Sequence, residues 1–348
     1  MVPGTQEQMA QQGPHIAVIA ALYKPRLAAA ARQLSSLKSQ TDVRVSIIAV
    51  LDGEETSNDP ELRELLVQHD CHVVTSRHQR GIRMAFAAGL EAALVRHLES
   101  GCLFAYCDQD DVWEPAKLSR TSGALTTPGV ALAHCDARIT DEAGNLIAPS
   151  LHRFESRREP NDLLGMLLLN TVTGMTAVFT RAVAEVAVRL CGKFEGAMLH
   201  DHITAIAAAS LGRVVCVNEP LADYVQHGAN QIGARPHIVW RSRALGIGHI
   251  SAYRHSSAVM FHERRGAALL LAALGLLPWN LRAMFVTDAR PNILALIAGC
   301  DAAMIKLLLT GDGRRAMLAL RMLDAGFFFL LGGGHRRPPP VFPEEIIP

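Results

Sequence analysis

The stretch "CLFAYCDQDDVW" (residues 102–113) passes from an apolar run directly into three aspartates and a glutamine. The apolar part predicts a short buried β-strand that ends just before Asp108. Carboxylates grouped at the end of a buried strand repel one another and are poorly solvated. The sequence therefore predicts that a positively charged partner belongs at this strand end.

This strand is the fourth in a series that alternates with helices. Helical spacing is expected over residues 25–40, 60–69 and 82–98, between strand-like runs at 15–22, 43–51, 71–76 and 102–107. The alternation predicts an α/β fold with a Rossmann-like, mainly parallel sheet flanked by helices. Because such sheets bind ligands at the carboxyl ends of their strands, Asp52 and Asp108 are expected to face one crevice.

The pattern changes beyond Trp113. Residues 129–150 predict a hairpin with its turn at 142–145, and residues 170–181 predict a strand entered through a polar loop. Residues 199–212 predict a helix that ends at Gly212. The chain from 236 to 334 reads as largely helical.

The composition and net charge of the chain exclude some classes of function. The chain has 348 residues, 49% of them hydrophobic, and a formal net charge of +1. Such near-neutrality argues against nucleic-acid binding, which depends on neutralising phosphates. The seven cysteines are scattered without C-x-x-C spacing, which predicts free, mostly buried thiols in a reducing cytosol. The first 14 residues lack an apolar signal core, so we expect a disordered leader and no export.

The acidic stretch has two interpretations. An Asp-x-Asp turn supplies oxygen ligands to a hard divalent cation and leaves the remaining positions to a substrate diphosphate. The cation would then stabilise charge on a leaving phosphate as a Lewis acid. Alternatively, the aspartates cap a helix that begins near Pro115.

Four motifs follow one another between the first strand and residue 233. They are "CDQDDVWEPAKL" (107–118), "NTVTGMT" (170–176), "HD" (200–201) and "YVQHGANQIG" (224–233). Together they resemble the D-Q-D-D-x-W-x-x-x-K-L, N-x-V-T-G-x-T, His-Asp and Y-x-Q-H-G-x-N-x-x-G elements of rhamnosyltransferase-like members of glycosyltransferase family 2. The resemblance implies a GT-A domain over residues 15–235, with a nucleotide-binding half (15–113) and an acceptor-binding half (114–235). The remaining parts are the leader (1–14), a helical C-terminal region (236–334) and a proline-rich tail (335–348).

The resemblance also implies an activity. It is that of a metal-dependent inverting hexosyltransferase that uses Mg²⁺ or Mn²⁺ and a nucleoside-diphosphate sugar. The acceptor would be a hydroxyl of a glycan or a lipid-linked saccharide, in bacterial surface polysaccharide biosynthesis. Asp201 matches the catalytic base.

Other residues receive roles through the same motifs and their surroundings. Those expected at the donor are Tyr23, Asp52, Arg80, Asp108 and Gln109. Those expected at the metal are Asp110, Asp108 and His227. Those expected at the acceptor, or supporting its loops, are Trp113, Thr173, Gly174, His200 and Gln226.

Each of these roles has a plainer alternative. Asp201 also fits a helix N-cap, and Arg80 fits either an anion contact at a helix start or a surface arginine. Trp113 fits either a packing anchor or a sugar platform. His227 fits either a metal ligand or an ordinary hydrogen-bonding group.

Two other functions remain open from the sequence. A haloacid-dehalogenase-type phosphatase also carries strand-D-x-D, with Asp108 as its nucleophile, although its motif usually lies on the first strand. A noncatalytic sugar-nucleotide-binding protein would keep the crevice without turnover.

The C-terminal part contains two apolar segments flanked by arginines, at residues 264–282 and 317–337. Neither uninterrupted run reaches the ~20 residues that span a bilayer. The segments fit helices packed on the catalytic domain or on a second copy of it, or helices at a membrane interface. The expected location is the cytoplasm, with peripheral contact at the inner membrane face in the last case.

Overall fold

The computed structural model describes residues 13–76, 81–99, 101–155, 157, 162–193, 198–226, 263–279 and 281–282. The chain divides into two compact units. The first comprises residues 1–159, 171–192 and 199–237, and the second comprises residues 160–170, 193–198 and 238–348. All the strands described below belong to the first unit.

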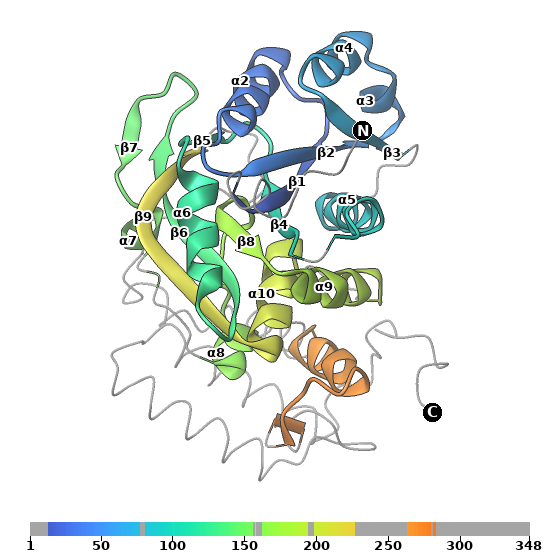
Figure 1. Cartoon of the computed structure of the whole chain (residues 1–348), viewed down its shortest axis with the longest axis vertical. Helices are drawn as coiled ribbons and strands as arrows, with labels where there is room; N and C mark the ends of the chain where they lie inside the picture. The colour runs from blue at the N-terminus through green and yellow to red at the C-terminus, as the bar shows by residue number, and fades with distance from the viewer. Residues whose placement is uncertain are drawn as a thin grey trace, which may run out of the picture. The chain divides into compact units, whose positions relative to one another are not determined.

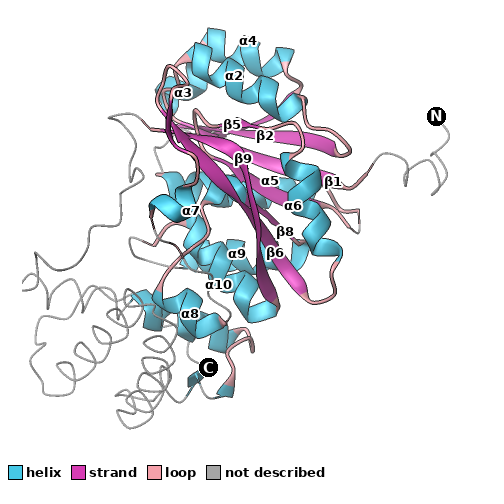
Figure 2. Ribbon diagram, turned by 90° about the vertical axis from the view of Figure 1, so that its left-hand side faces the viewer, coloured by secondary structure: helices cyan, strands magenta, loops and turns pink. Residues whose placement is uncertain are grey.

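The described strands form one nine-stranded sheet, in the order β3-β2-β1-β4-β8-β6-β9-β5, with β7 paired to β6 beside this path. Figure 2 shows them running through the first unit as a twisted sheet. Their bounds are β1 (His15–Leu22), β2 (Arg44–Asp52), β3 (Cys71–Ser76), β4 (Leu103–Cys107), β5 (Val112–Trp113), β6 (Val130–Thr140), β7 (Leu146–Ala148), β8 (Ala177–Phe179) and β9 (Arg213–Val225).

The first half of the sheet is parallel, as predicted. In β3-β2-β1-β4 every neighbouring pair is parallel, and the predicted strand bounds agree within about one residue. Residues 16–20 of β1 are completely inaccessible to solvent. A strand covered on both faces needs apolar side chains at every position, which explains the unbroken run "IAVIA".

The second half of the sheet mixes directions. Strand β8 is antiparallel to both β4 and β6, whereas β6 is parallel to β9. The predicted hairpin is present as β6 and β7, joined by a turn in which the Gly144 N–H donates to the carbonyl oxygen of Asp141. A connection this short allows only an antiparallel pair. The parallel arrangement thus describes strands β1 to β4 rather than the whole sheet.

Helices cover both faces of the parallel half. Figure 1 shows α2 and α4 on one side of β1 and β2, and α5 on the other. The short helix α3 was not predicted from the sequence. The helices of the first unit are α2 (Leu27–Lys38), α3 (Glu54–Asn58), α4 (Pro60–Gln68), α5 (Ile82–Arg96), α6 (Lys117–Gly123), α7 (Leu151–Phe154), α9 (Arg181–Lys193) and α10 (His200–Leu211), with 3-10 turns at Ala124–Thr126 and Gly174–Thr176.

Helix α5 packs unusually close to the sheet. A Cβ added to Gly89 would lie 2.4 Å from Cγ2 of Ile19 on β1 and 2.6 Å from Cγ2 of Val50 on β2. No side chain fits at those distances, so glycine lets the helix backbone rest directly on the two strands. This contact holds the middle of α5 close to β1 and β2.

The carboxyl ends of β1, β2 and β4 lie at one edge of the sheet. The registers pair Leu22 with Leu51 and Ala20 with Cys107, so the chain leaves these strands at neighbouring points. The segments that begin at Tyr23, Asp52 and Asp108 therefore share this edge, as the topology predicted.

The second unit is described only in part. It contains α8 (Leu163–Leu168) and a helix over residues 263–273. The apolar segment 317–337, the proline-rich tail and residues 1–12 of the predicted leader lie outside the described residues. Within the described part, no helix has the length and hydropathy needed to cross a membrane. The six cysteines that are described are free thiols.

Candidate active site

The acidic loop, residues 108–111, connects β4 to β5 and is held in place by two glutamines. Gln33 of α2, which is completely buried, donates from Nε2 to the carbonyl oxygen of Asp108 at 2.5 Å. Oε1 of Gln109 accepts a hydrogen bond from the backbone N–H of Tyr23 at 2.9 Å. The loop is therefore tied to α2 on one side and to the turn after β1 on the other.

Asp110 lies at the tip of this loop in a left-handed backbone conformation. Its φ is +73° and the residue is only 5% exposed. This conformation costs free energy for any residue other than glycine, although Asp and Asn tolerate it best. Such strain collects at functional sites, where the surrounding structure holds it in place.

Asp111 is buried more deeply and has an unsatisfied oxygen. Oδ1 accepts a hydrogen bond from the Val225 N–H at 3.2 Å, but Oδ2 is inaccessible to solvent and has no partner among the described residues. Burial, and then the charge of Asp108, raise the pKa of Asp111 well above its usual range. The sequence interpretation counted Asp111 among the crowded carboxylates but gave it no role.

Lys117 places a positive charge close to Asp111 of the acidic loop. It is completely buried, and its ammonium lies 3.1 Å from the ring centroid of Trp113, a cation–π contact. Burial lowers the pKa of Lys117 to about 8, partly opposed by nearby Cys135, Cys107 and Asp111. Trp113 is 2% exposed. Its ring therefore packs in the core next to the acidic loop and is not accessible to a sugar.

The helix-capping interpretation of the acidic loop is wrong. Helix α6 begins at Lys117, its N-cap is Ala116, and no side chain accepts a hydrogen bond there. Asp111 instead accepts a hydrogen bond from Val225 of β9, and the carboxylate of Asp108 lies beside Gly174 and His200 of α10.

Gly174 is the point where three motifs meet. A Cβ on this glycine would lie 2.7 Å from Nε2 of His200, 3.4 Å from Oδ2 of Asp108 and 3.5 Å from Cβ of Asp201. The absence of a side chain at Gly174 thus lets the acidic loop and the start of α10 approach each other. We call this group of four residues the Gly174 junction.

His200 is the buried aromatic member of the Gly174 junction. Its ring stacks on Phe86 at 3.8 Å between centroids and meets Tyr106 edge-on at 4.8 Å. Both ring nitrogens are buried without a hydrogen-bond partner in the described part of the chain, and Nε2 lies 4.0 Å from Oδ1 of Asp108. Burial lowers the pKa of His200 to about 3, so the ring is neutral at physiological pH.

Asp201 occupies the first turn of α10 but does not cap it. The N-cap position belongs to Leu199, and Oδ1 of Asp201 accepts a hydrogen bond from the His202 N–H at 2.6 Å. Burial, together with the negative charge of Asp201, raises the pKa of Asp108 to about 7, against a lowering hydrogen bond from the Met175 backbone. Asp108 and Asp201 therefore lie in one electrostatic environment.

Further polar residues surround these carboxylates. Thr173 Oγ1 accepts a hydrogen bond from Nη1 of Arg157 at 2.7 Å, while Nε of Arg157 donates to Glu155 at 2.8 Å. Burial raises the pKa of Tyr224, as do the charges of Asp111 and Asp108. The sequence assigned no role to Arg157, because its partner Thr173 becomes a neighbour only in the fold.

The predicted donor residues lie at the same sheet edge. Asp52 is 4% exposed, and its Oδ2 accepts a hydrogen bond at 3.1 Å from the N–H of Gly81, the N-cap of α5. Tyr23 is 42% exposed.

The remaining predicted site residues are Gln226, Arg80 and His227. The backbone N–H of Gln226 donates to the carbonyl oxygen of Thr140 at 2.8 Å. Arg80 and His227 lie outside the described residues.

The carboxylates at this edge fit a hard divalent cation. Burial, and then the charge of a neighbouring carboxylate, raise the pKa values of Asp108 and Asp111, and Asp111 Oδ2 lacks a partner among the described residues. Mg²⁺ and Mn²⁺ prefer such oxygen ligands and satisfy them without a proton. The donor chemistry of the acidic loop therefore agrees with the expected metal.

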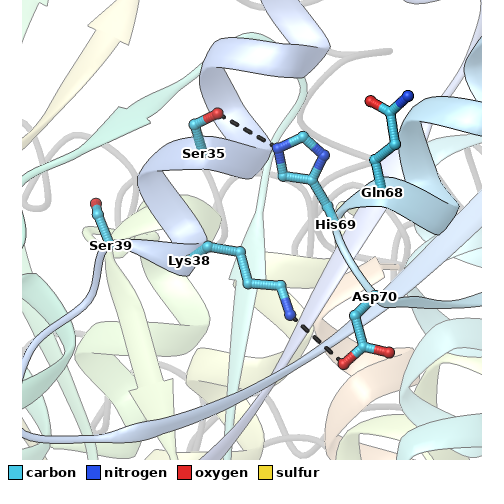
Figure 3. A pocket seen from close by; sticks show the side chains of 6 residues that line it. All are labelled: Ser35, Lys38, Ser39, Gln68, His69 and Asp70. Carbon is cyan, nitrogen blue, oxygen red and sulfur yellow. Dashed lines mark hydrogen bonds and ion pairs between the residues drawn. The ribbon is translucent and has the colours of Figure 1, made fainter.

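A separate hollow of about 480 Å³ lies at the ends of α2 and α4 (Figure 3). Its lining includes an ion pair of 3.7 Å between Lys38 and Asp70 and a 3.3 Å contact between Ser35 Oγ and His69 Nε2. None of the residues that line it belongs to the acidic loop or the Gly174 junction. It is a surface feature distinct from the candidate site.

Comparison with known proteins finds a similarity to one protein family. Residues 18–186, just under half of the chain, match the family model described as glycosyl transferase family 2. The match includes the acidic loop and Gly174 and ends before α10. Together with the observed sheet and its flanking helices, it confirms the predicted α/β fold of the GT-A type.

Other comparisons are weaker. A crystal structure of S. aureus TarS 1-349 in complex with UDP-GlcNAc is similar at 14% sequence identity and a TM-score of 0.43, covering 91% of this chain and 92% of that chain. No curated protein matches the chain significantly in sequence.

We expect Gly174→Ala to destabilise the protein. The added methyl group would overlap His200 Nε2, and overpacking of this kind costs ~1–3 kcal/mol. The matched control is Gly192→Ala near the end of α9, where an added Cβ meets nothing within 4 Å and alanine is favoured by ~0.5–1 kcal/mol. Thermal unfolding should show a lower Tm for the first variant alone. Equal melting temperatures would contradict the close contact.

We expect Asp108→Asn to stabilise the metal-free protein at alkaline pH. The pKa of Asp108 is raised from 3.8 to about 7, so its protonated form favours folding. That contribution is complete below pH 3.8 and is lost as the pH rises through about 7. Asparagine removes the charge, so the gain in Tm should be larger at pH 8 than at pH 5, about 2–4 °C per kcal/mol.

The control for this measurement is Asp70→Asn, since the Asp70 side chain is 99% exposed. Both variants should be melted in chelator at both pH values. A pH-independent effect of Asp108→Asn, equal to that of Asp70→Asn, would show that the Asp108 charge carries no folding cost.

Proposed function

We propose that this chain is a glycosyltransferase of family 2, and that it is a metal-dependent, inverting enzyme of the rhamnosyltransferase-like type. It transfers a sugar from a nucleoside-diphosphate donor to a hydroxyl of a glycan or lipid-linked acceptor, in bacterial surface polysaccharide synthesis. The observation that best supports the proposal is that Asp108 and Asp201, which belong to separate motifs, both lie next to Gly174. An enzyme of this kind needs both a leaving-group site and a base in one crevice.

The donor nucleotide is proposed to bind along the ends of β1, β2 and β4. Asp52 and Tyr23 contact the nucleoside, and Gln109 joins the Tyr23 turn to the acidic loop through its 2.9 Å hydrogen bond. Arg80 supplies a cation near the N-terminus of α5, where helix amides favour anions. This arrangement directs the diphosphate toward Asp108 and Asp110.

The metal is proposed to bind Asp110 and Asp108, with His227 as a further ligand from outside the described residues. When bound, Mg²⁺ or Mn²⁺ stabilises negative charge on the leaving diphosphate as a Lewis acid. The protein contributes a strained, buried Asp110 backbone and two glutamine hydrogen bonds that hold the loop. These features keep the carboxylates in place before the donor arrives.

Asp201 is the proposed general base. Its carboxylate accepts the proton of the acceptor hydroxyl while the hydroxyl oxygen bonds to the anomeric carbon. The bond between that carbon and the diphosphate oxygen breaks, and its electron pair leaves with the diphosphate. Attack opposite to the leaving group inverts the anomeric carbon, through the oxocarbenium-like state known from glycoside hydrolysis.

His200 is a poor candidate for the same step. With a pKa of about 3, its ring binds protons too weakly to hold the acceptor's proton at neutral pH. It also stacks on Phe86 inside the protein. Its proposed role is to position Asp108 and Asp201 around Gly174.

The acceptor side is proposed to include Thr173 and Gln226, with Trp113 supporting the loop from below. Arg157 is added to this group because it holds Thr173 at 2.7 Å. The proposed location is the cytoplasm, with peripheral contact at the inner membrane face for a lipid-linked acceptor. A homo-oligomer formed through the C-terminal helices is the other arrangement that the apolar segment 264–282 suits.

We expect Asp201→Asn to abolish turnover while leaving donor affinity within about threefold. Removal of a general base costs ~10²–10⁴-fold in rate, whereas the donor binds mainly through the other strand ends. Transfer from labelled nucleotide-sugars and donor binding by calorimetry would be measured together, with Asp70→Asn as the control. Full activity in Asp201→Asn would remove it from the base role.

The same assay separates the rival functions. A phosphatase would release phosphate from phosphate esters and lose this activity in Asp108→Asn. A noncatalytic binding protein would bind the donor equally in the wild type and in Asp201→Asn, without product from either.

We expect Asp110→Asn to lose metal-dependent nucleotide binding. Asparagine tolerates the φ of +73° at this position, so the variant removes a charge and keeps the loop conformation. In a thermal-shift screen, one nucleoside diphosphate from a panel of uridine, guanosine and thymidine diphosphates should stabilise the wild type with Mn²⁺ and fail to do so with chelator.

Asp110→Asn should lose this Mn²⁺-dependent shift, and Asp70→Asn should retain it. An identical shift in all three proteins would place the metal elsewhere.

A further inference from the structure

A group of side chains of the types that can bind a metal ion lies at the opposite edge of the sheet. His15 begins β1 and Cys102 directly precedes β4, while His97 and Glu99 follow the end of α5. Since β1 and β4 are parallel, with Ile16 paired to Leu103, their amino ends share an edge. The acidic loop follows the carboxyl end of β4. The two groups are therefore separated by the length of the strands β1 and β4.

The four side chains converge on one point. One possible ligand atom from each lies within 4.8 Å of the corresponding atoms of the other three. Oε1 of Glu99 lies 2.6 Å from Nδ1 of His15 and 3.6 Å from Nδ1 of His97. The two imidazole rings meet at 90° with their centroids 4.7 Å apart. Two nitrogens, one oxygen and one sulfur are therefore available at ligand–ligand spacing.

We propose that His15, His97, Glu99 and Cys102 bind one Zn²⁺ ion. Zinc takes four ligands in tetrahedral geometry and accepts His nitrogen, Cys sulfur and carboxylate oxygen together. Mg²⁺ and Mn²⁺, which suit the acidic loop, prefer an all-oxygen set. Four protein ligands leave no open position, which is typical of a structural site.

The surroundings of the four residues support this assignment. A ligating histidine usually hydrogen-bonds through its second ring nitrogen, and Nε2 of His15 lies 2.8 Å from Oγ of Ser46. Arg181 donates to the carbonyl oxygen of His97 and so holds the turn after α5. Cys102 is 1% exposed, whereas the Glu99 side chain is 41% exposed, so the group of four residues reaches the surface at Glu99.

Charge balance makes the two anionic ligands essential. The Glu99 carboxylate and a Cys102 thiolate together neutralise a divalent ion. Burial raises the pKa of the Cys102 thiol to about 11, with Arg181 and Arg44 lowering it to a smaller extent, so the ion must displace the thiol proton to bind sulfur. Loss of either anionic ligand would leave part of the charge of the ion uncompensated, so binding should depend steeply on both.

The proposed ion would connect three parts of the fold. It would join the start of β1, the end of α5 and the start of β4, which are distant in the chain. In this role the zinc stabilises the nucleotide-binding half from the edge opposite the chemistry. A second cluster, His134, His152 and Cys216, has only three ligand atoms within the same spacing and serves as an internal comparison.

The test uses the full chain without an affinity tag, stripped with chelator and then titrated with Zn²⁺. Elemental analysis should find one tightly bound zinc per chain, and saturation at 100 times Kd should raise the Tm by about 5 °C or more. Substitution with Co²⁺ should produce a thiolate-to-metal charge-transfer band. Absence of bound zinc would overturn the proposal.

Variants identify the ligands. Cys102→Ser and Glu99→Gln should weaken zinc binding by roughly 100-fold or more, and Cys102→Ser should remove the charge-transfer band. Cys191→Ser changes a buried cysteine on α9 and should keep both. Glu99→Gln changes an exposed side chain, so it remains informative if Cys102→Ser fails to fold. Zinc binding that survives Glu99→Gln, or is lost in Cys216→Ser instead, would overturn the assignment.

Discussion

The repulsion among carboxylates at the end of β4 is the constraint on which the rest of the site depends. Burial and then the charge of Asp201 raise the pKa of Asp108, while burial and then the charge of Asp108 raise the pKa of Asp111. A fold optimised for stability alone would place these groups in water. Lys117 offsets part of the repulsion, but its ammonium is engaged with the Trp113 ring. This loss of stability agrees with the proposed site, because a binding site arranged before its ligand arrives usually costs stability.

The scaffold keeps these charges together by contacts that allow little movement. Gln33 and Gln109 fix the backbone of the acidic loop, while Gly174 lets α10 approach it without a side chain between them. Gly89 plays the same part for α5, which rests directly on β1 and β2. The two glycines act at different levels. Gly89 sets the distance between a helix and the sheet, and Gly174 allows Asp108 and Asp201 to lie close to each other.

The sequence predicted the parallel strands and the acidic loop because both depend on local pattern. A strand covered on both faces must be continuously apolar, as residues 16–20 are, and the aspartates follow the fourth such run directly. The mixed direction of β6, β8 and β9 was not predicted, since pairing direction there depends on where distant segments meet. For the same reason the sequence did not predict the contact of Arg157 with Thr173 or the buried, neutral state of His200. The residues that contact Arg157 and His200 lie far away in the chain.

The two proposed ions use the two ends of the same strands, and their ligand chemistry keeps them apart. Oxygen ligands at the carboxyl edge favour a hard cation that also needs substrate phosphates to complete its shell. Nitrogen and sulfur at the amino edge favour zinc, which four protein ligands enclose fully. A closed site neither exchanges its ion during turnover nor competes for the catalytic one. The parallel strands β1 and β4 would thus be held at one end by a permanent ion and used at the other by a transient one.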